Sequence, residues 1–172
     1  MVGGVSSINP SLYMKKFIIV SAVFVFISQF SAQAYSVGDI VINEIAWAGS
    51  GDASGDEWIE LFNPTNQKID LSGWVIVDDG SAEYKIDQGE IAPHGYFLIE
   101  DNEDAVSDLK ADVLISLSLA NAGDSLTLKD SAGVLVDKVN SSGGAWYAGD
   151  SEDKASMERI DPGITNDEAG NF

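Results

Sequence analysis

The chain has 172 residues with 28 acidic and 9 basic side chains, which gives a formal net charge of −19. This charge argues against a surface built for the phosphate backbone of nucleic acids or for anionic lipid head groups, because both would be repelled. The chain has no cysteine, which excludes disulfides, thiol catalysis and thiolate metal sites.

Residues 1–34 are predicted to be a secretory signal peptide that enters export as a helix. Two lysines precede a 14-residue apolar run, Phe17 to Phe30, and Ala32-Gln33-Ala34 follows as a small-x-small cleavage site. The run is shorter than the about 20 residues of a bilayer span, although an uncleaved membrane anchor remains an alternative. Met14 lies directly before the lysines and leaves open a later true start. We therefore expect a secreted, periplasmic or cell-surface protein that meets the membrane only through this segment during export.

Residues 35–39 are predicted to be a short linker, and residues 40–160 one domain of short strands. The domain begins with two apolar runs, Ile40 to Trp47 and Glu57 to Asn63. The loop between them, residues 48–56, contains three glycines that give its backbone freedom to turn. A strand, a loop and a second strand predict a β-hairpin.

Further apolar runs separated by turn residues follow, at 69–71, 74–77, 84–86, 96–99, 113–119, 126–129, 134–139 and 156–160. The run at 113–119 alternates most clearly with a period of two, and with the next two runs it predicts a meander. Short strands at this spacing predict an all-β sandwich or barrel. The four tryptophans are expected to pack in its core, with a sugar-stacking platform as the alternative. Residues 161–172 are expected to form a polar C-terminal tail.

Two groups of carboxylates are candidate sites. Glu44 and Glu60 occupy matched places in the two hairpin strands, so strand pairing would bring them together. Paired carboxylates serve acid–base chemistry or bind a hard cation, but we interpret this pair as structural acceptors of hydrogen bonds. Asp52, Asp56 and Glu57 offer oxygen ligands in the first loop, and they are the predicted ligands if the domain binds calcium. No other cofactor is expected.

No catalytic machinery is predicted. His94 is the only histidine and lies between Pro93 and Gly95, where we expect an exposed turn residue. A serine–histidine–acid triad needs its histidine held against a nucleophile, and the chain has no G-x-S-x-G motif. Hydrolysis by carboxylates alone is the one chemistry left open. We therefore expect a protein that is not an enzyme.

Several sequence blocks together resemble a known family. They are residues 41–45 with Trp47, 56–64, 69–74, Ile91 with Pro93, 95–96, 121–124 and 156–160. On these blocks the chain resembles the lamin-tail domain in its bacterial secreted form, over about residues 40–160. The resemblance implies a mostly antiparallel, immunoglobulin-like β-sandwich that serves as a non-catalytic interaction or attachment module.

The resemblance also implies a kind of partner. Bacterial members are exported alone or beside extracellular hydrolases, so we expect a protein or cell-envelope ligand. Nuclear members contact nucleic acid, which is not expected here because of the acidic surface. A calcium-dependent adhesive domain and an accessory fragment of a secreted hydrolase or nuclease remain alternatives. Family members often continue into a closing strand, so the tail at 161–172 is also a candidate truncation.

Overall fold

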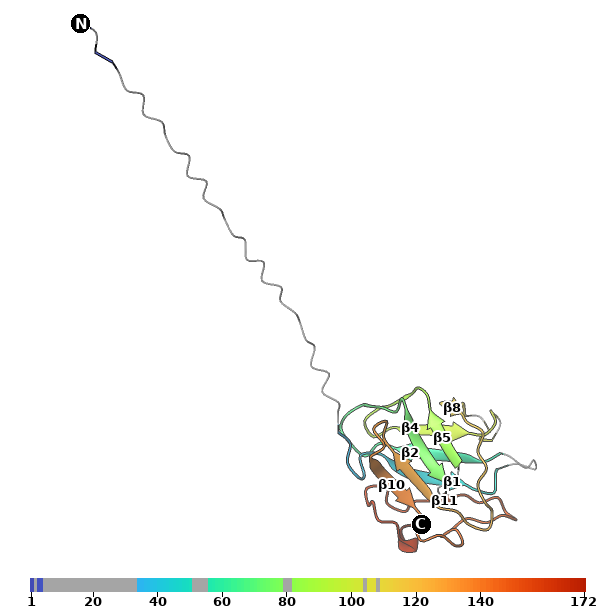
Figure 1. The fold of residues 1–172 in the computed structure, drawn as a ribbon. Helices are drawn as coiled ribbons and strands as arrows, with labels where there is room; N and C mark the ends of the chain where they lie inside the picture. Colours follow the sequence, from blue (N-terminus) through green and yellow to red (C-terminus); the bar gives the residue numbers. More distant parts are fainter. Residues whose placement is uncertain (2, 5–33, 51–55, 79–81, 104, 108) are drawn as a thin grey trace. The chain divides into compact units, whose positions relative to one another are not determined.

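The computed structural model describes residues 1, 3–4, 34–50, 56–78, 82–103, 105–107 and 109–172. The sheets and the core all belong to one compact unit, Gln33–Phe172 (Figure 1). Nearly all of the predicted signal peptide, including its helix, lies outside the described residues. In the described part of the chain, no helix has the length and apolar character needed to cross a bilayer.

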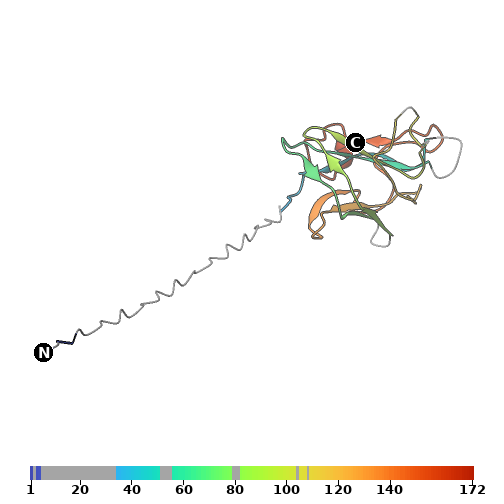
Figure 2. The same ribbon diagram turned by 90° about the horizontal axis from the view of Figure 1, so that it is seen from above.

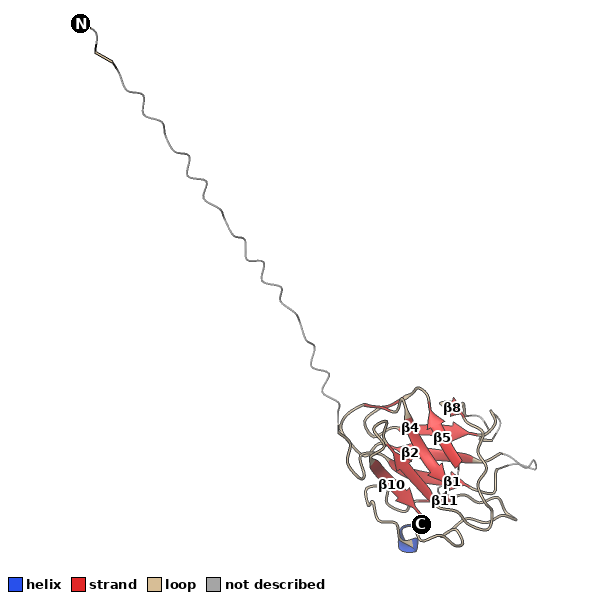
Figure 3. Cartoon of the chain, viewed as in Figure 1, coloured by secondary structure: helices blue, strands red, loops and turns tan. Residues whose placement is uncertain are grey.

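The described residues form an almost entirely β structure (Figure 3). A five-stranded sheet has the order β11 (Met157–Glu158), β1 (Val41–Ala46), β2 (Trp58–Phe62), β7 (Tyr96–Glu100) and β8 (Val113–Leu114). A four-stranded sheet has the order β10 (Leu135–Val139), β9 (Leu126–Lys129), β4 (Trp74–Asp78) and β5 (Ala82–Ile86). A small sheet pairs β3 (Ile69–Asp70) with β6 (Glu90–Ile91), and a 3₁₀ turn, η1, spans Ala169–Asn171. The predicted all-β class is confirmed.

The predicted hairpin forms the centre of the five-stranded sheet. β1 and β2 pair antiparallel, with Ala46 opposite Trp58 at the end near the loop. Along β2, Ile59 and Leu61 are fully buried, whereas the alternate residues remain partly exposed. Successive side chains of a strand point to opposite faces, so β2 gives one face to the core and one to the exterior.

The two larger sheets lie in separate layers with the core between them (Figure 2). Ile45 and Ile59 enter this core from the five-stranded sheet, and Trp74, Ile76 and Leu128 enter it from the four-stranded sheet. Each fully buried side chain of this size contributes about 1.5–3 kcal/mol of transfer free energy. With no disulfide available, this packing is the main source of stability, and the architecture is the predicted β-sandwich.

The predicted strand at 113–119 is wrong beyond its first two residues. Only β8 forms, and it runs parallel to β7 in the five-stranded sheet, while β9 and β10 form a hairpin in the other sheet. The predicted meander of three strands is therefore wrong as well. Leu117 and Leu119 are buried as their alternation implied, but their N–H groups bond to carboxylates and not to a strand. Alternation reports which side chains are buried, not what pairs with the backbone.

Residues 144–172 complete the sandwich. β11 pairs with β1 at the sheet edge, and Met157 is fully buried in the core. Trp146 stacks on Trp47 with ring centroids 6.2 Å apart. The expected polar tail, residues 161–172, lies against the domain through Asp167, whose carboxylate accepts the N–H groups of Asn140 and Ser141, and through Phe172, whose ring lies beside that of Tyr147.

Candidate functional site

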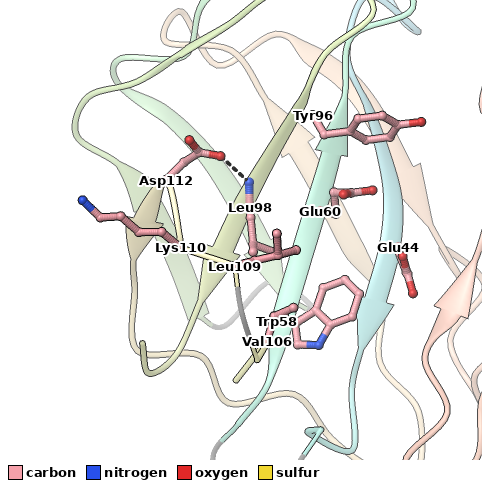
Figure 4. Close-up of a pocket in the computed structure, with 9 residues that line it drawn as sticks. All are labelled: Glu44, Trp58, Glu60, Tyr96, Leu98, Val106, Leu109, Lys110 and Asp112. Atoms are coloured by element: carbon pink, nitrogen blue, oxygen red, sulfur yellow. Dashed lines mark hydrogen bonds between the residues drawn. The ribbon is translucent and has the colours of Figure 1, made fainter. Parts of the chain in front are cut away.

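A hollow of about 400 Å³ opens on the outer face of the five-stranded sheet (Figure 4). Strands β1, β2 and β7 supply its floor, and the segment that leads from β7 to β8 supplies one wall. Its lining residues are Glu44, Trp58, Glu60, Tyr96, Leu98, Val106, Leu109, Lys110 and Asp112. The hollow therefore combines aromatic and aliphatic surface with carboxylates.

Strand register brings the predicted glutamate pair together in this hollow. Glu60 on β2 lies directly opposite Glu44 on β1 and, on its other side, opposite Leu98 on β7. Glu44 in turn lies opposite Glu158 on the edge strand β11. Three carboxylates thus follow one another across three adjacent strands, an arrangement in which like charges repel.

Neutral hydrogen-bond donors hold the two inner glutamates. The Ser156 hydroxyl donates to Glu44, and the Asn43 amide donates to Glu60 Oε1 at 2.8 Å. Asn43 can reach Glu60 because the pairing of β1 and β2 shifts register between Ile42 and Glu44. The ion pairs found among the described residues include neither of these glutamates nor Glu158.

Burial is the first cause that raises the pKa of both Glu44 and Glu60. The hydrogen bonds from Ser156 and Asn43 act in the opposite direction and favour the charged forms. The charge of Glu158 raises the pKa of both glutamates further, and Glu44 adds to the effect on Glu60. The negative charge in the hollow is therefore incompletely compensated by the protein itself.

Aromatic and aliphatic side chains form the rest of the hollow. Trp47, Trp74 and Trp146 are buried as predicted, but Trp58 is only partly buried and faces this hollow. Tyr96 is 55% exposed. Its ring lies 4.9 Å from that of Phe62, centroid to centroid. Together with Leu109, which is 62% exposed, these side chains leave an apolar patch of the kind that marks interaction sites.

The described residues show no catalytic arrangement in this hollow. His94 does not line it, and its Nε2 lies 3.0 Å from Asn66 Oδ1 in an exposed turn, as predicted for this residue. In the part of the chain that the structure describes, no group of three histidine or acidic side chains could hold a metal ion. The two neighbouring glutamates each accept a hydrogen bond, Glu44 from Ser156 and Glu60 from Asn43.

The predicted calcium ligands are only partly described. Asp52 lies outside the described residues. Glu57 Oε2 accepts a hydrogen bond from the Leu119 N–H at 2.8 Å, and Asp56 is 9% exposed. Burial raises the pKa of Glu57, which the hydrogen bond from Leu119 partly offsets. The carboxylate of Glu57 therefore has a structural role, and calcium binding in this loop stays a prediction.

Sequence reasoning named the two glutamates but missed the apolar part of the hollow. The alternation of β2 already places Trp58 on the same face as Glu60, opposite Ile59 and Leu61. The sequence therefore contained a signal that Trp58 lies beside Glu60. Leu109 gave no such signal, because it lies in an acidic segment, residues 101–112, that is not part of any regular run.

The comparisons with known proteins agree with the architecture. The lamin tail domain family matches residues 33–143 of the chain. No curated protein matches it. The matched region includes most of the hollow, whereas Ser156 and Glu158 beside Glu44 come from the segment after it.

Proposed function

Because the chain belongs to the lamin tail domain family, we propose that it is an exported interaction module that binds a partner protein and catalyses no reaction. The family is immunoglobulin-like, and the antiparallel pairing that dominates both larger sheets is consistent with that fold. The proposal places the contact on the outer face of the five-stranded sheet.

One observation carries this proposal: a partly exposed tryptophan lies in an open hollow on a sheet face. The other tryptophans of the chain are buried, so Trp58 is the tryptophan that the fold leaves available. Tryptophan and tyrosine at the centre of a hollow are typical anchors of protein–protein contacts. Trp58 and Tyr96 both line this one.

Charge favours a basic partner. The chain carries a formal net charge of −19, and Glu44 and Glu60 concentrate negative charge at the hollow itself. Complementary charge steers two proteins together and suppresses acidic competitors. A basic protein surface therefore fits this face better than nucleic acid or an acidic sugar does.

Export rests on the sequence pattern. The lysines, the short apolar run and the small residues before Tyr35 are typical of a secretory signal. A chain without cysteine needs no oxidation step to fold after export. The signal-like pattern favours work outside the cytoplasm, at the cell surface or in the surrounding medium, and the absence of cysteine is compatible with it.

The proposal is tested by localisation and by retention. The full chain, expressed in its source cells with a C-terminal tag, should be found outside the cytoplasm with Tyr35 as its N-terminal residue. The fluorescently labelled domain, residues 35–172, should then be retained on those cells, and Trp58→Ala with Tyr96→Ala should reduce retention at least tenfold.

A matched control removes an exposed apolar side chain elsewhere. Val134 is 48% exposed and lies outside the hollow, so Val134→Ala should leave retention unchanged. Uniform cytoplasmic localisation would contradict export. Equal retention of the Trp58/Tyr96 variant and the Val134 variant would contradict the assigned face.

A further inference from the structure

We propose that the hollow on the outer face of the five-stranded sheet takes the cationic side chain of an arginine or lysine presented by a basic segment of the partner. This inference rests on the proposed function and adds to it the chemical group that is recognised. It depends on three features of the hollow: its unbalanced carboxylates, its aromatic surface and its size.

The carboxylates are arranged for a cation. Glu44 and Glu60 lie directly opposite each other on paired strands, with Glu158 next in the row. Their hydrogen-bond donors, Ser156 and Asn43, are neutral and leave the charge in place. Coulomb repulsion between such neighbours falls when a positive group lies between them.

The basic side chain that borders the hollow does not fill this role. Lys110 lines the hollow, but Figure 4 shows its ammonium group pointing away from Glu44 and Glu60, on the far side of Leu98. The side chain of Arg159 is 0% exposed and is paired with Asp137. Among the described residues, these cations leave the two glutamates without an ionic partner.

The aromatic and aliphatic surface suits the remainder of the same side chain. Arginine and lysine bury their methylene stems on apolar surface while the charged head stays polar. Trp58 and Leu98 offer such surface beside Glu60, and Tyr96 extends it. A cation over the face of tryptophan or tyrosine gains further electrostatic attraction.

The size of the hollow agrees with a side chain more than with a whole domain surface. Its volume is about 400 Å³. Ligand-sized sites in proteins span about 300–1,000 Å³, so this one lies near the lower limit. A single long side chain, with the backbone that carries it, is an occupant of suitable size.

A peptide titration tests the inference. The probes are capped nonapeptides of alternating arginine and serine, of lysine and serine, and of glutamate and serine, at 0.15 M salt. The indole Nε1–H resonance of Trp58 reports on the hollow in two-dimensional NMR spectra of isotope-labelled protein. We expect saturable shifts of this resonance with an arginine or lysine peptide, and none with the glutamate peptide.

Two double variants separate the site from general charge attraction. Glu44→Gln/Glu60→Gln keeps one acceptor oxygen on each side chain, the first for Ser156 and the second for Asn43. This variant should weaken peptide binding at least tenfold. Glu83→Gln/Asp87→Asn removes the same charge from β5 and from the residue that follows it, neither of which lines the hollow, and it should weaken binding less than twofold. Circular dichroism and the unfolding midpoint of each variant show whether it has folded.

The outcomes distinguish this inference from the proposed function. Equal weakening in both double variants, or no shift of the Trp58 indole with any peptide, overturns cation recognition in the hollow. If cell retention still depends on Trp58 and Tyr96 in that case, the interaction module stands and only the recognised group is wrong. Peptide binding at the hollow without cell retention overturns the proposed function and supports the site.

Discussion

Arg159 and Asp137 form an ion pair at 3.0 Å whose side chains are 0% and 1% exposed. Asp137 Oδ2 also accepts the Ile42 N–H at 2.7 Å, and Arg159 Nε donates to the Ile42 carbonyl at 2.8 Å. Because Asp137 belongs to β10 and Ile42 to β1, the pair joins the two sheets. It also attaches the segment after β11 to both of them.

Arg159→Met should destabilise the domain by about 3–5 kcal/mol, because it leaves the Asp137 carboxylate buried without its cationic partner. The free energy of unfolding from urea titration measures the loss. Lys85→Met is the control, since the exposed ion pair between Lys85 and Asp87 should contribute at most about 1 kcal/mol. Equal stability of the two variants would show that the buried ion pair contributes no more to the free energy of unfolding than the exposed one.

A chain that ends at Gly143, the limit of the region matched by the family, should fail to fold stably. It would lose β11 from the edge of β1, Met157 from the core and Trp146 from its stack on Trp47. Dispersion of its amide NMR spectrum measures folding. Removing residues 1–34 is the control and should leave the spectrum of the sandwich intact. A well-dispersed spectrum from the truncated chain would contradict the structural role of residues 144–172.

The hairpin of β1 and β2 could be predicted because two neighbouring apolar runs and a glycine-containing loop report local structure. The ion pair between Arg159 and Asp137 could not, since no spacing rule links residues that meet only after the sheets stack. The hollow could be predicted only in part, because some of its residues come from neighbouring strands and others from a distant loop. Strand matching indicated Glu44 with Glu60, but its wall at Leu109 depends on how a loop without a regular pattern lies on the sheet.

Stability should rise as the pH falls from 7 towards about 5. Burial is the first cause that raises the pKa values of four carboxyl groups in the folded state, those of Glu44, Glu57, Glu60 and Asp137. The pKa of Asp137 reaches about 6 despite its pairing with Arg159. Above the unfolded values of about 4, the folded state therefore binds more protons than the unfolded chain, and lower pH favours folding.

The trend should reverse below about pH 4, the unfolded value for carboxyl groups. Hydrogen bonds to the carboxylates lower the pKa values of Asp70 and Asp150, and those to Asp167 outweigh its burial. The stability that these groups contribute is present above the unfolded pKa and is lost as they take up protons. Thermal unfolding followed by circular dichroism from pH 3 to 8 should show a maximum between about 4 and 6. A steady decline from pH 7 to 5 would contradict the assignment.

Glu57→Ala should loosen the segment at 115–120, because Leu119 would keep a buried N–H without its acceptor. An unpaired buried donor costs about 1–3 kcal/mol, whereas Glu57→Gln retains an acceptor oxygen and should cost less. Amide hydrogen exchange measures the effect at Leu119 itself, where protection should fall in the alanine variant and largely persist in the glutamine variant. Glu83→Ala, on an exposed position of β5, is the control and should leave Leu119 unchanged. If Leu119 exchanges at the same rate in all three variants, the carboxylate of Glu57 does not hold this segment, and its oxygens are available for the calcium site predicted in the first loop.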